Sequence, residues 1–420
     1  MLLKTIPGNS KYVKKLNRMT VINIIKTHEP ISRQQLAEIT GLTPPAITGI
    51  IRELLDMGIV KEVGLDKSTG GRRPIKLCIN PDAGYVIGIE VTRFESFVGT
   101  CDLKNYPTDF RTLKIDMTEP DKGINELTSA INSILNEEMY SKKTFLGIGV
   151  AFPGLLNVSE GTVKRSINLG HQWDAFPVKH FLEKQLGMPV FIENNSKASA
   201  LAERWFGGAK GCKDLVYVNW GEGISAGVIM NDRILQGAHG HAGEIGHMSI
   251  QEGGQLCNCG NRGCLESFCG IPAIVRTVKS NIASLSDDDP LKKAWVEKGE
   301  LSIEDIIKSS QNENSYSSEL LKQAAFYMGK AMANVINFYN PECVFIGGKM
   351  AGVAKYFIDI INRAVKSHAF PEVVNSTDIQ VSSLREKAGV MGACALVLRD
   401  LFKPDSDMLE DVEQAYPNEA

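Results

Sequence analysis

The chain has 420 residues, 43% of them hydrophobic and 23% charged, which is the composition of an ordinary soluble globular protein. This length exceeds what one compact domain usually holds, so we expect two or three domains. No stretch approaches the roughly 18 apolar residues of a membrane span, and residues 1–10 lack the apolar core of a signal peptide. The sequence therefore argues against membrane insertion and secretion, and predicts a cytoplasmic protein.

Charge is divided unevenly along the chain. Residues 1–80 contain 13 Lys and Arg against 6 Asp and Glu, a net charge of +7, whereas the whole chain carries -3. A basic N-terminal region on an acidic body suggests that this region alone binds a polyanion. A chance fluctuation of surface charge would give the same imbalance, so the interpretation depends on the motifs.

The first predicted elements are two helices. Residues 16–26 carry apolar side chains at helical spacing. Ser32 and Gln35 form a capping-box pattern that opens a second helix, and Gly41 ends it. We expect the apolar side chains of this second helix to face inward, namely Leu36, Ala37 and Ile39.

A third helix is predicted at residues 44–57. Thr43 can cap its start, and Pro44 suits the first turn, where its missing N–H costs nothing. Gly58 suits the end of the helix. Its apolar face is expected to comprise Ile47, Ile51, Leu54 and Leu55. A helix, a short turn and a second helix, preceded by a first, are typical of a helix-turn-helix.

Two strands should follow, at residues 60–64 and 75–79. Between them lies a basic segment rich in glycine, residues 67–74, which includes Arg72 and Arg73. This pattern predicts a β-hairpin wing with an arginine-rich tip. Residues 11–80 are therefore predicted to form a winged helix-turn-helix domain.

The predicted domain carries side chains suited to DNA. Small residues on the outward face of the third helix permit close approach to a major groove, and Arg52 can reach a phosphate or a guanine. The wing arginines suit a minor groove or the backbone. The predicted contacts with operator DNA are Arg33, Gln34, Thr43, Pro45, Ala46, Thr48, Arg52, Arg72 and Arg73. The alternative is a winged helix that binds another protein, and the arginine-tipped wing and the local charge favour DNA over it.

Strands and helices alternate through the remainder of the chain, which predicts an α/β fold. The predicted strands are residues 85–90, 97–102, 145–151, 190–193, 215–220, 226–230 and 343–348. The predicted helices are residues 124–139, 196–206 and 319–337, and the polar residues 281–318 are predicted to be an insertion with short helices. We expect this body to span residues 81–402 and an acidic, poorly ordered tail to span residues 403–420.

Four potential metal ligands occur close together in the sequence. Three thiolates and one imidazole complete a tetrahedral zinc site without an open position, so the predicted role of Zn²⁺ is structural. The predicted ligands are His247, Cys257, Cys259 and Cys264. Cys269 is an alternative ligand, but its place in the following helix favours a core cysteine. The nine cysteines are odd in number and otherwise scattered, which argues against a disulfide framework.

These residues also resemble a family signature. The run Gly243-Glu244-Ile245-Gly246-His247, followed by Cys257-x-Cys259-Gly260-x-x-Gly263-Cys264-x-Glu266, resembles that of the ROK family of repressors, open reading frames and kinases. The resemblance extends through Phe152-Pro153-Gly154, Asn168, Glu193-Asn194-Asn195 and Gly347-Gly348. The winged region, ending in Gly70-Gly71-Arg72-Arg73-Pro74, resembles the repressor branch, which includes xylose and N-acetylglucosamine repressors.

The resemblance implies a two-lobed, actin-like (ribonuclease-H-like) fold of the sugar-kinase type, with a sugar in the cleft, and a homodimer or homotetramer. Carried over by position, the implied sugar-binding residues are Asn168, Asn194, Asn195, Glu244, His247 and Glu266. His247 would touch the sugar with one side of its ring and hold the zinc through a nitrogen. For Glu266 and Asn168 the alternative is ordinary capping or turn hydrogen bonding.

Three departures from the kinase members of the family predict that the chain is not an enzyme. In the kinases, the first phosphate loop reads Gly-x-Asp-x-Gly-Gly-Thr. Residues 88–94 keep the first glycine of this pattern but lack the two adjacent glycines near its end. Glu222 places a carboxylate in the second phosphate loop. Asn195 replaces the aspartate that serves as general base, and an amide cannot take a proton from a sugar hydroxyl.

The sequence therefore predicts a sugar-responsive DNA-binding regulator, a repressor of carbohydrate-utilisation genes that sugar binding releases from DNA. The same mechanism would allow sugar binding to activate transcription instead, and the sequence leaves this alternative open. Two further hypotheses are a ROK-type sugar kinase with an appended DNA-binding domain, and a constitutive DNA-binding protein whose body is only an oligomerisation scaffold.

Overall fold

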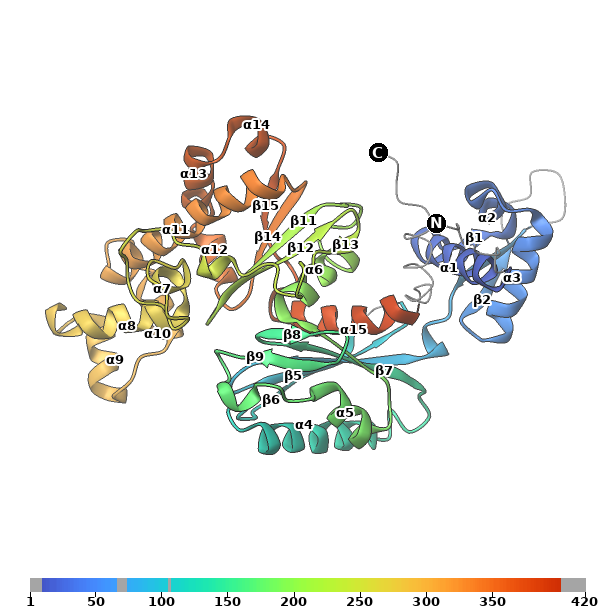
Figure 1. Ribbon diagram of the computed structural model, residues 1–420, viewed down its shortest axis with the longest axis horizontal. Coiled ribbons are helices and arrows are strands. Elements are labelled where there is room, and N and C mark those ends of the chain that lie inside the picture. The colour runs from blue at the N-terminus through green and yellow to red at the C-terminus, as the bar shows by residue number, and fades with distance from the viewer. Residues whose placement is uncertain (1–9, 66–73, 105–106, 402–420) are drawn as a thin grey trace, which may run out of the picture.

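The computed structural model describes residues 10–65, 74–104 and 107–401. These residues form an N-terminal head and two α/β lobes, with two helices between the lobes (Figure 1). Arg72 and Arg73, and the predicted tail at residues 403–420, lie outside the described residues. Among the residues that are described, no helix is long and apolar enough to cross a membrane.

The head is a winged helix-turn-helix. Ser32 forms the predicted capping box with Gln35, and Gly41 ends the second helix in the left-handed conformation, with φ 69°. The three strands pair antiparallel in the order β1-β3-β2. The elements of the head are α1 (Ser10–His28), β1 (Ile31–Ser32), α2 (Arg33–Thr40), α3 (Pro44–Asp56), β2 (Val60–Leu65) and β3 (Ile75–Ile79).

Two local predictions for the head are wrong. Ile39 does not face inward but is 50% exposed, because α2 has only about two turns and packs on α1 and α3 through the face of Leu36. Thr43 occupies the N-cap of α3, but its side chain makes no capping hydrogen bond. One of the two backbone donors that a cap usually satisfies is missing there, because Pro45 at the second helical position has no N–H.

Lobe 1 is built on a five-stranded sheet in the order β10-β7-β4-β5-β6. Helices α4 and α5 cover one face of this sheet (Figure 1). A small hairpin, β8 with β9, extends from it. The elements are β4 (Tyr85–Val91), β5 (Ser96–Asp102), β6 (Pro107–Leu113), α4 (Pro120–Leu135), β7 (Phe145–Phe152), β8 (Leu155–Asn157), β9 (Thr162–Arg165), α5 (Val178–Leu186) and β10 (Val190–Asn194).

The helix predicted at residues 124–139 is displaced by four residues, and strand β6 was not predicted. Pro120 occupies the first turn of α4, the position where a proline is tolerated, so the helix begins before its first buried isoleucine. Strand β6 lies at the sheet edge and carries polar residues, which leaves no clear alternation in the sequence.

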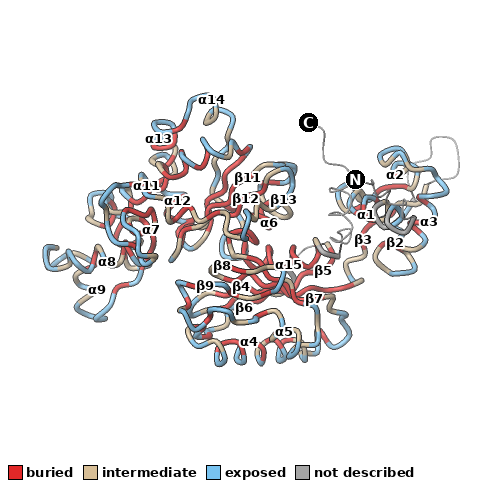
Figure 2. The backbone as a smooth tube through the Cα atoms, viewed as in Figure 1, coloured by how far each residue is buried: buried red, intermediate tan, exposed pale blue. Residues whose placement is uncertain are grey.

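Lobe 2 is built on a second five-stranded sheet, in the order β13-β12-β11-β14-β15. Figure 2 shows the central strands of both sheets as buried, among them β4, β7, β11 and β14. The strands are β11 (Leu215–Trp220), β12 (Ile224–Met230), β13 (Arg233–Ile234), β14 (Cys343–Gly347) and β15 (Asp378–Val381). The helices are α7 (Glu266–Cys269), α8 (Ile271–Asn281), α9 (Pro290–Lys298), α10 (Ile303–Ser309), α11 (Tyr316–Tyr339), α12 (Ala351–Tyr356), α13 (Ile358–His368) and α14 (Pro371–Val374).

Two helices cross between the lobes. Helix α6 (Asn195–Trp205) follows the last strand of lobe 1 but packs on β11 and β12 of lobe 2. Helix α15 (Ala388–Leu401) follows the last strand of lobe 2 but packs on β4 and β7 of lobe 1. Each lobe therefore supplies the helix that covers the other, as an actin-like fold requires, and the two helices lie against each other (Figure 1).

Candidate ligand cleft and metal centre

A cavity of about 610 Å³ lies between the two lobes. Its wall comes from the β4–β5 turn, the junction of β10 with α6, the β11–β12 turn and the start of α15. This volume is in the range of small-molecule sites. All six predicted sugar-binding residues line it: Asn168, Asn194, Asn195, Glu244, His247 and Glu266.

Two asparagines at the junction of β10 and α6 form one corner of the cavity. The Asn194 side chain caps α6, because its Oδ1 accepts from the N–H of Ser196 at 2.9 Å. Its Nδ2 donates to the carbonyl of Gly154 at 3.1 Å. Asn195 donates through Nδ2 to the carbonyl of Val91 at 3.1 Å, whereas no group among the described residues donates to its buried Oδ1. A buried acceptor without a donor is costly, so this atom suits a ligand hydroxyl.

Two carboxylates lie elsewhere on the cavity wall. Glu266, the first residue of α7, accepts through Oε2 from the N–H of Ile224 at 2.8 Å, so the backbone bonding considered as its alternative role is present. Burial raises the pKa of Glu244 above its ordinary value, while His247 and Lys197 partly oppose the rise. Asn168 lies exposed in the segment after β9, close to Gly223 of the β11–β12 turn.

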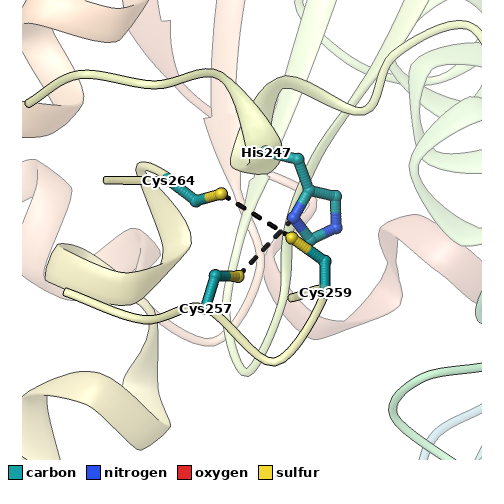
Figure 3. Close-up of side chains that lie close together, drawn as sticks. All are labelled: His247, Cys257, Cys259 and Cys264. Atoms are coloured by element: carbon teal, nitrogen blue, oxygen red, sulfur yellow. Dashed lines mark hydrogen bonds between the residues drawn. The ribbon is translucent and has the colours of Figure 1, made fainter. Parts of the chain in front are cut away.

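The four predicted metal ligands converge beside this cavity (Figure 3). Their ligand atoms all lie within 4.8 Å of one another, and the set could hold a metal ion. Cys259 and Cys264 bring their Sγ atoms to 3.7 Å. The loop folds this tightly through Gly263, whose φ is 79° and where a Cβ would overlap the carbonyl of Gln251.

Cys269 is not part of the cluster. It is fully buried, and its Sγ donates to the carbonyl of Leu265 at 3.3 Å within its own helix. The interpretation as a core cysteine is therefore the one that the fold bears out.

The His247 ring joins the cluster to the cavity. It ends a short 3-10 helix (Ile245–His247), and its Nδ1 lies 3.7 Å from the Sγ of Cys257. Its Nε2 faces the other way and lies 4.0 Å from Oε2 of Glu244. One side of the ring thus faces the thiols and the other a carboxylate of the cavity.

The sequence did not predict a buried polar network behind Glu244. Lys197 is 2% exposed, and its Nζ donates to Gln236 Oε1 and to the carbonyl of Gly240, both at 2.8 Å. Gln236 in turn donates to Glu193 Oε2 at 2.6 Å. Burial lowers the pKa of Lys197. The network fastens the segment that leads to Glu244, and its one sequence signal was a lysine within a run of small helical residues.

Two further carboxylate side chains line the cavity. Burial raises the pKa of Glu90 from 4.5 to about 7, and the nearby Glu386 carboxylate adds to the rise. The carboxylate of Glu90 contacts the start of α15, since a Cβ on Gly389 would overlap it. Glu222 is exposed in the β11–β12 turn and also lines the cavity.

In the head, those predicted DNA contacts that the structure describes lie on α2, on α3 and at the cap of α3. A groove between these helices is lined by Arg33, Gln34 and Thr48, among others. Arg33 donates to Glu62 of β2 at 2.8 Å, and Gln34 donates to Glu38 at 3.0 Å. The exposed predicted contacts of α3 and its cap are Thr43, Pro45, Ala46, Thr48 and Arg52.

Comparison with known proteins identifies both parts. The ROK family model matches residues 108–400, and a model described as winged helix-turn-helix DNA-binding matches residues 15–61. The chain belongs to the ROK family. Among relatives of this ROK protein, the xylose repressor of Caldicellulosiruptor bescii is 30% identical over 94% of this chain and 98% of the relative. The DNA-binding transcriptional dual regulator NagC of Escherichia coli K12 is 29% identical over 94% and 95%.

Solved structures agree with the architecture of the ROK protein. A ROK family transcriptional regulator, described as a homolog of the E. coli MLC protein, superposes with a TM-score of 0.81 at 27% identity. The match covers 93% of this chain and 97% of that one. The ROK family glucokinase of Streptomyces griseus shares the fold, with a TM-score of 0.67 at 21% identity over 74% and 99% of the chains.

Proposed function

We propose that this ROK protein is a sugar-responsive DNA-binding repressor of carbohydrate-utilisation genes, released from DNA when a sugar enters the cleft. The observation that carries the proposal is a cavity between two lobes, lined by amide and carboxylate side chains, in a chain whose head exposes α3. Two relatives that match nearly the full length of the chain support this function, since one is named a xylose repressor and the other a DNA-binding transcriptional dual regulator, NagC.

The cavity side chains suit a carbohydrate. Sugar hydroxyls both donate and accept hydrogen bonds, and rigidly held amides and carboxylates distinguish their stereochemistry. The Oδ1 of Asn195, which has no donor in the described part of the chain, offers an acceptor, and the carboxylates of Glu244 and Glu266 offer more. We assign these three, with Asn168, Asn194 and His247, as the sugar-binding residues.

We propose that the metal is zinc. Three thiols and one imidazole are the ligands that Zn²⁺ prefers, and together they fill a tetrahedral shell. The ion would then have no position for a substrate, and its role would be to hold the loop that carries His247 beside the cavity.

The cleft lacks the means to transfer a phosphoryl group. Asn195 cannot act as general base, and Glu222 brings a carboxylate to the turn where a kinase would hold phosphates. Repressor relatives also favour a regulator over an enzyme. The rival function is a ROK-type sugar kinase with an appended DNA-binding domain.

On DNA, we propose that α3 enters the major groove and that Arg52 contacts a phosphate or a guanine. The full set of proposed DNA contacts is Arg33, Gln34, Thr43, Pro45, Ala46, Thr48, Arg52, Arg72 and Arg73. A homodimer or homotetramer would place two heads on two half-sites, so lobe closure that alters head spacing would weaken binding. We place this complex in the cytoplasm.

The test is a titration of the full-length protein. A duplex is selected from a random pool, and its Kd is measured with and without D-xylose, D-glucose and N-acetylglucosamine. We expect at least one sugar to change the Kd by about 5- to 150-fold, the usual range of allosteric coupling. No change with any of these sugars would contradict sugar-controlled DNA binding, and consumption of ATP in their presence would favour the kinase.

A further inference from the structure

The head is fastened to lobe 1. One continuous cluster of buried apolar side chains includes Ile22 and Ile25 of α1, Val86 of lobe 1, and Val397 and Leu398 of α15. An ion pair reinforces this attachment, with the Nζ of Lys104 in lobe 1 at 2.9 Å from Oε1 of Glu29 in the head. The head and lobe 1 should therefore move together, with α15 between them.

A second contact joins the head to α6, whose last residue packs against the same apolar cluster. Trp205, the last residue of α6, lies under the head, and the Nζ of Lys26 in α1 is 3.7 Å from the centroid of its ring. A cation this close to an indole face is attracted by the ring quadrupole. Burial lowers the pKa of Lys26 to about 7, and Lys210 contributes to the fall, so Lys26 is present both as ammonium and as neutral amine near pH 7.

Helix α6 also reaches the cavity. Its first residue is Asn195, whose Oδ1 lacks a donor, and its last is Trp205. Eleven residues of α-helix span roughly 16 Å at about 1.5 Å per residue. The same helix thus carries a proposed ligand contact at one end and the Lys26 contact at the other.

The interface between α6 and α15 is built from small residues. Ala198 of α6 meets Ala393 of α15 in a buried cluster, and a Cβ on Gly392 would overlap the carbonyl of Ala198. On its other side α6 touches lobe 2 as closely, because a Cβ on Gly227 would overlap the carbonyl of Ser196. Helix α6 therefore packs closely against both α15 and the sheet of lobe 2, so a movement of lobe 2 relative to lobe 1 must displace α6 against one of them.

We propose that the contact between Trp205 and Lys26 transmits occupancy of the cleft to the DNA-binding head. When the lobes close on a ligand, α6 moves with lobe 2, whereas α15 and the head stay with lobe 1. The Trp205 ring then shifts beneath α1 and reorients the head. This inference rests on the proposed function, since it names how the sugar signal reaches the DNA site.

The experiment separates transmission from binding. Four full-length variants are compared with wild type: Trp205→Leu and Lys26→Met remove the contact, Lys26→Arg keeps a cation over the ring, and Trp295→Leu is the matched control. Trp295 has a similar contact, 5.7 Å from the Nζ of Lys279, but in α9 of lobe 2. Kd values for the selected duplex are measured with and without the three sugars, together with the sugar Kd in the absence of DNA.

We expect Trp205→Leu and Lys26→Met to keep both separate affinities within about twofold of wild type and to lose most of the coupling between them. Lys26→Arg and Trp295→Leu should couple as wild type does. Wild-type coupling in both contact-removing variants would overturn the inference and leave the proposed function intact. A wild-type protein that shows no coupling with any of the three sugars would instead overturn the proposed function.

A second measurement needs no variant. Amide hydrogen exchange of the wild-type protein is followed with and without the coupling sugar. We expect exchange in α1 around Lys26 to change on sugar binding, although no described residue of the head lines the cavity. Unchanged exchange in α1, alongside a changed affinity for DNA, would overturn this route.

Discussion

Two polar corners of the cleft differ in whether their side chains find bonding partners within the protein. At the metal centre, four ligand atoms converge within 4.8 Å, and a glycine turn without room for a side chain holds them there. At the start of α6, Asn195 keeps a buried oxygen without a donor among the described residues, and Glu90, next to the Val91 that Asn195 bonds, has a pKa raised by burial. The first corner is complete once an ion is bound, whereas the second is complete only when a ligand fills the cavity.

This difference predicts that the metal centre governs metal content, the folding of its loop and through it the orientation of His247, whereas the second corner governs ligand affinity alone. Replacing Cys257 by serine removes one thiolate, so we expect metal content to fall from about one ion per chain to near zero. The melting temperature should fall, and sugar affinity should drop about 10- to 100-fold, because His247 loses its orientation. Metal analysis and thermal melting check this, with Cys212→Ser as the matched control outside the cluster.

The second corner is tested by Asn195→Ala. Loss of the amide leaves a sugar hydroxyl without its acceptor, and we expect sugar affinity to fall about 5- to 100-fold, with little change in metal content. Isothermal titration calorimetry measures the affinity. A variant that binds sugar as tightly as wild type would show that this corner is not the ligand contact, and the comparison between the corners would fail.

A similar comparison can be made between two exposed basic residues, one proposed to contact DNA and one without a proposed ligand. Arg52 is exposed on α3, whereas Lys122 is exposed on α4 of lobe 1, far along the chain from the head. We expect Arg52→Ala to weaken duplex binding by about 5- to 150-fold and to reduce its salt dependence. Lys122→Ala should leave both unchanged, and equal effects of the two substitutions would contradict the proposed interface.

The smallest expected effect concerns Glu90 and pH. Its pKa rises from 4.5 to about 7 on folding, so the folded state holds this proton more tightly than the unfolded chain. The associated stability is present below about pH 4.5 and is lost as pH rises through 7, roughly 3 kcal/mol in all. The melting temperature of Glu90→Gln should therefore fall less than that of wild type as the pH rises from 5 to 8.

The matched control for that experiment is Glu126→Gln on the exposed face of α4. Its melting curve should follow that of wild type at every pH. Parallel behaviour of all three proteins would mean that Glu90 does not titrate between the two states as its burial beside Glu386 implies.

Local chemistry explains which features the sequence could predict. The capping box at Ser32 depends on residues three apart, and the cysteine cluster depends on one short loop, so both can be read along the chain. The six cavity residues were predicted because they match a family signature, and the fold brings all of them to one cavity.

Features that depend on packing from two sides were missed. Helix α15 is buried between a sheet and α6, so its apolar residues show no helical stripe to recognise. Lys197 can be buried because it bonds to partners about forty residues away along the chain, and its sequence neighbours do not indicate these partners. The position of Trp205 beneath Lys26 likewise joins two segments that only the tertiary fold brings together.

The most direct test of the account is reciprocity between the two ligands. Coupling free energy is shared, so the selected duplex must change the affinity for the effector sugar by the same factor by which the sugar changes the affinity for the duplex. Calorimetric titration of the full-length protein with that sugar, with and without saturating duplex, measures this factor. We predict that saturating duplex raises the Kd for the sugar by the matching factor. An identical Kd in both titrations would contradict the account.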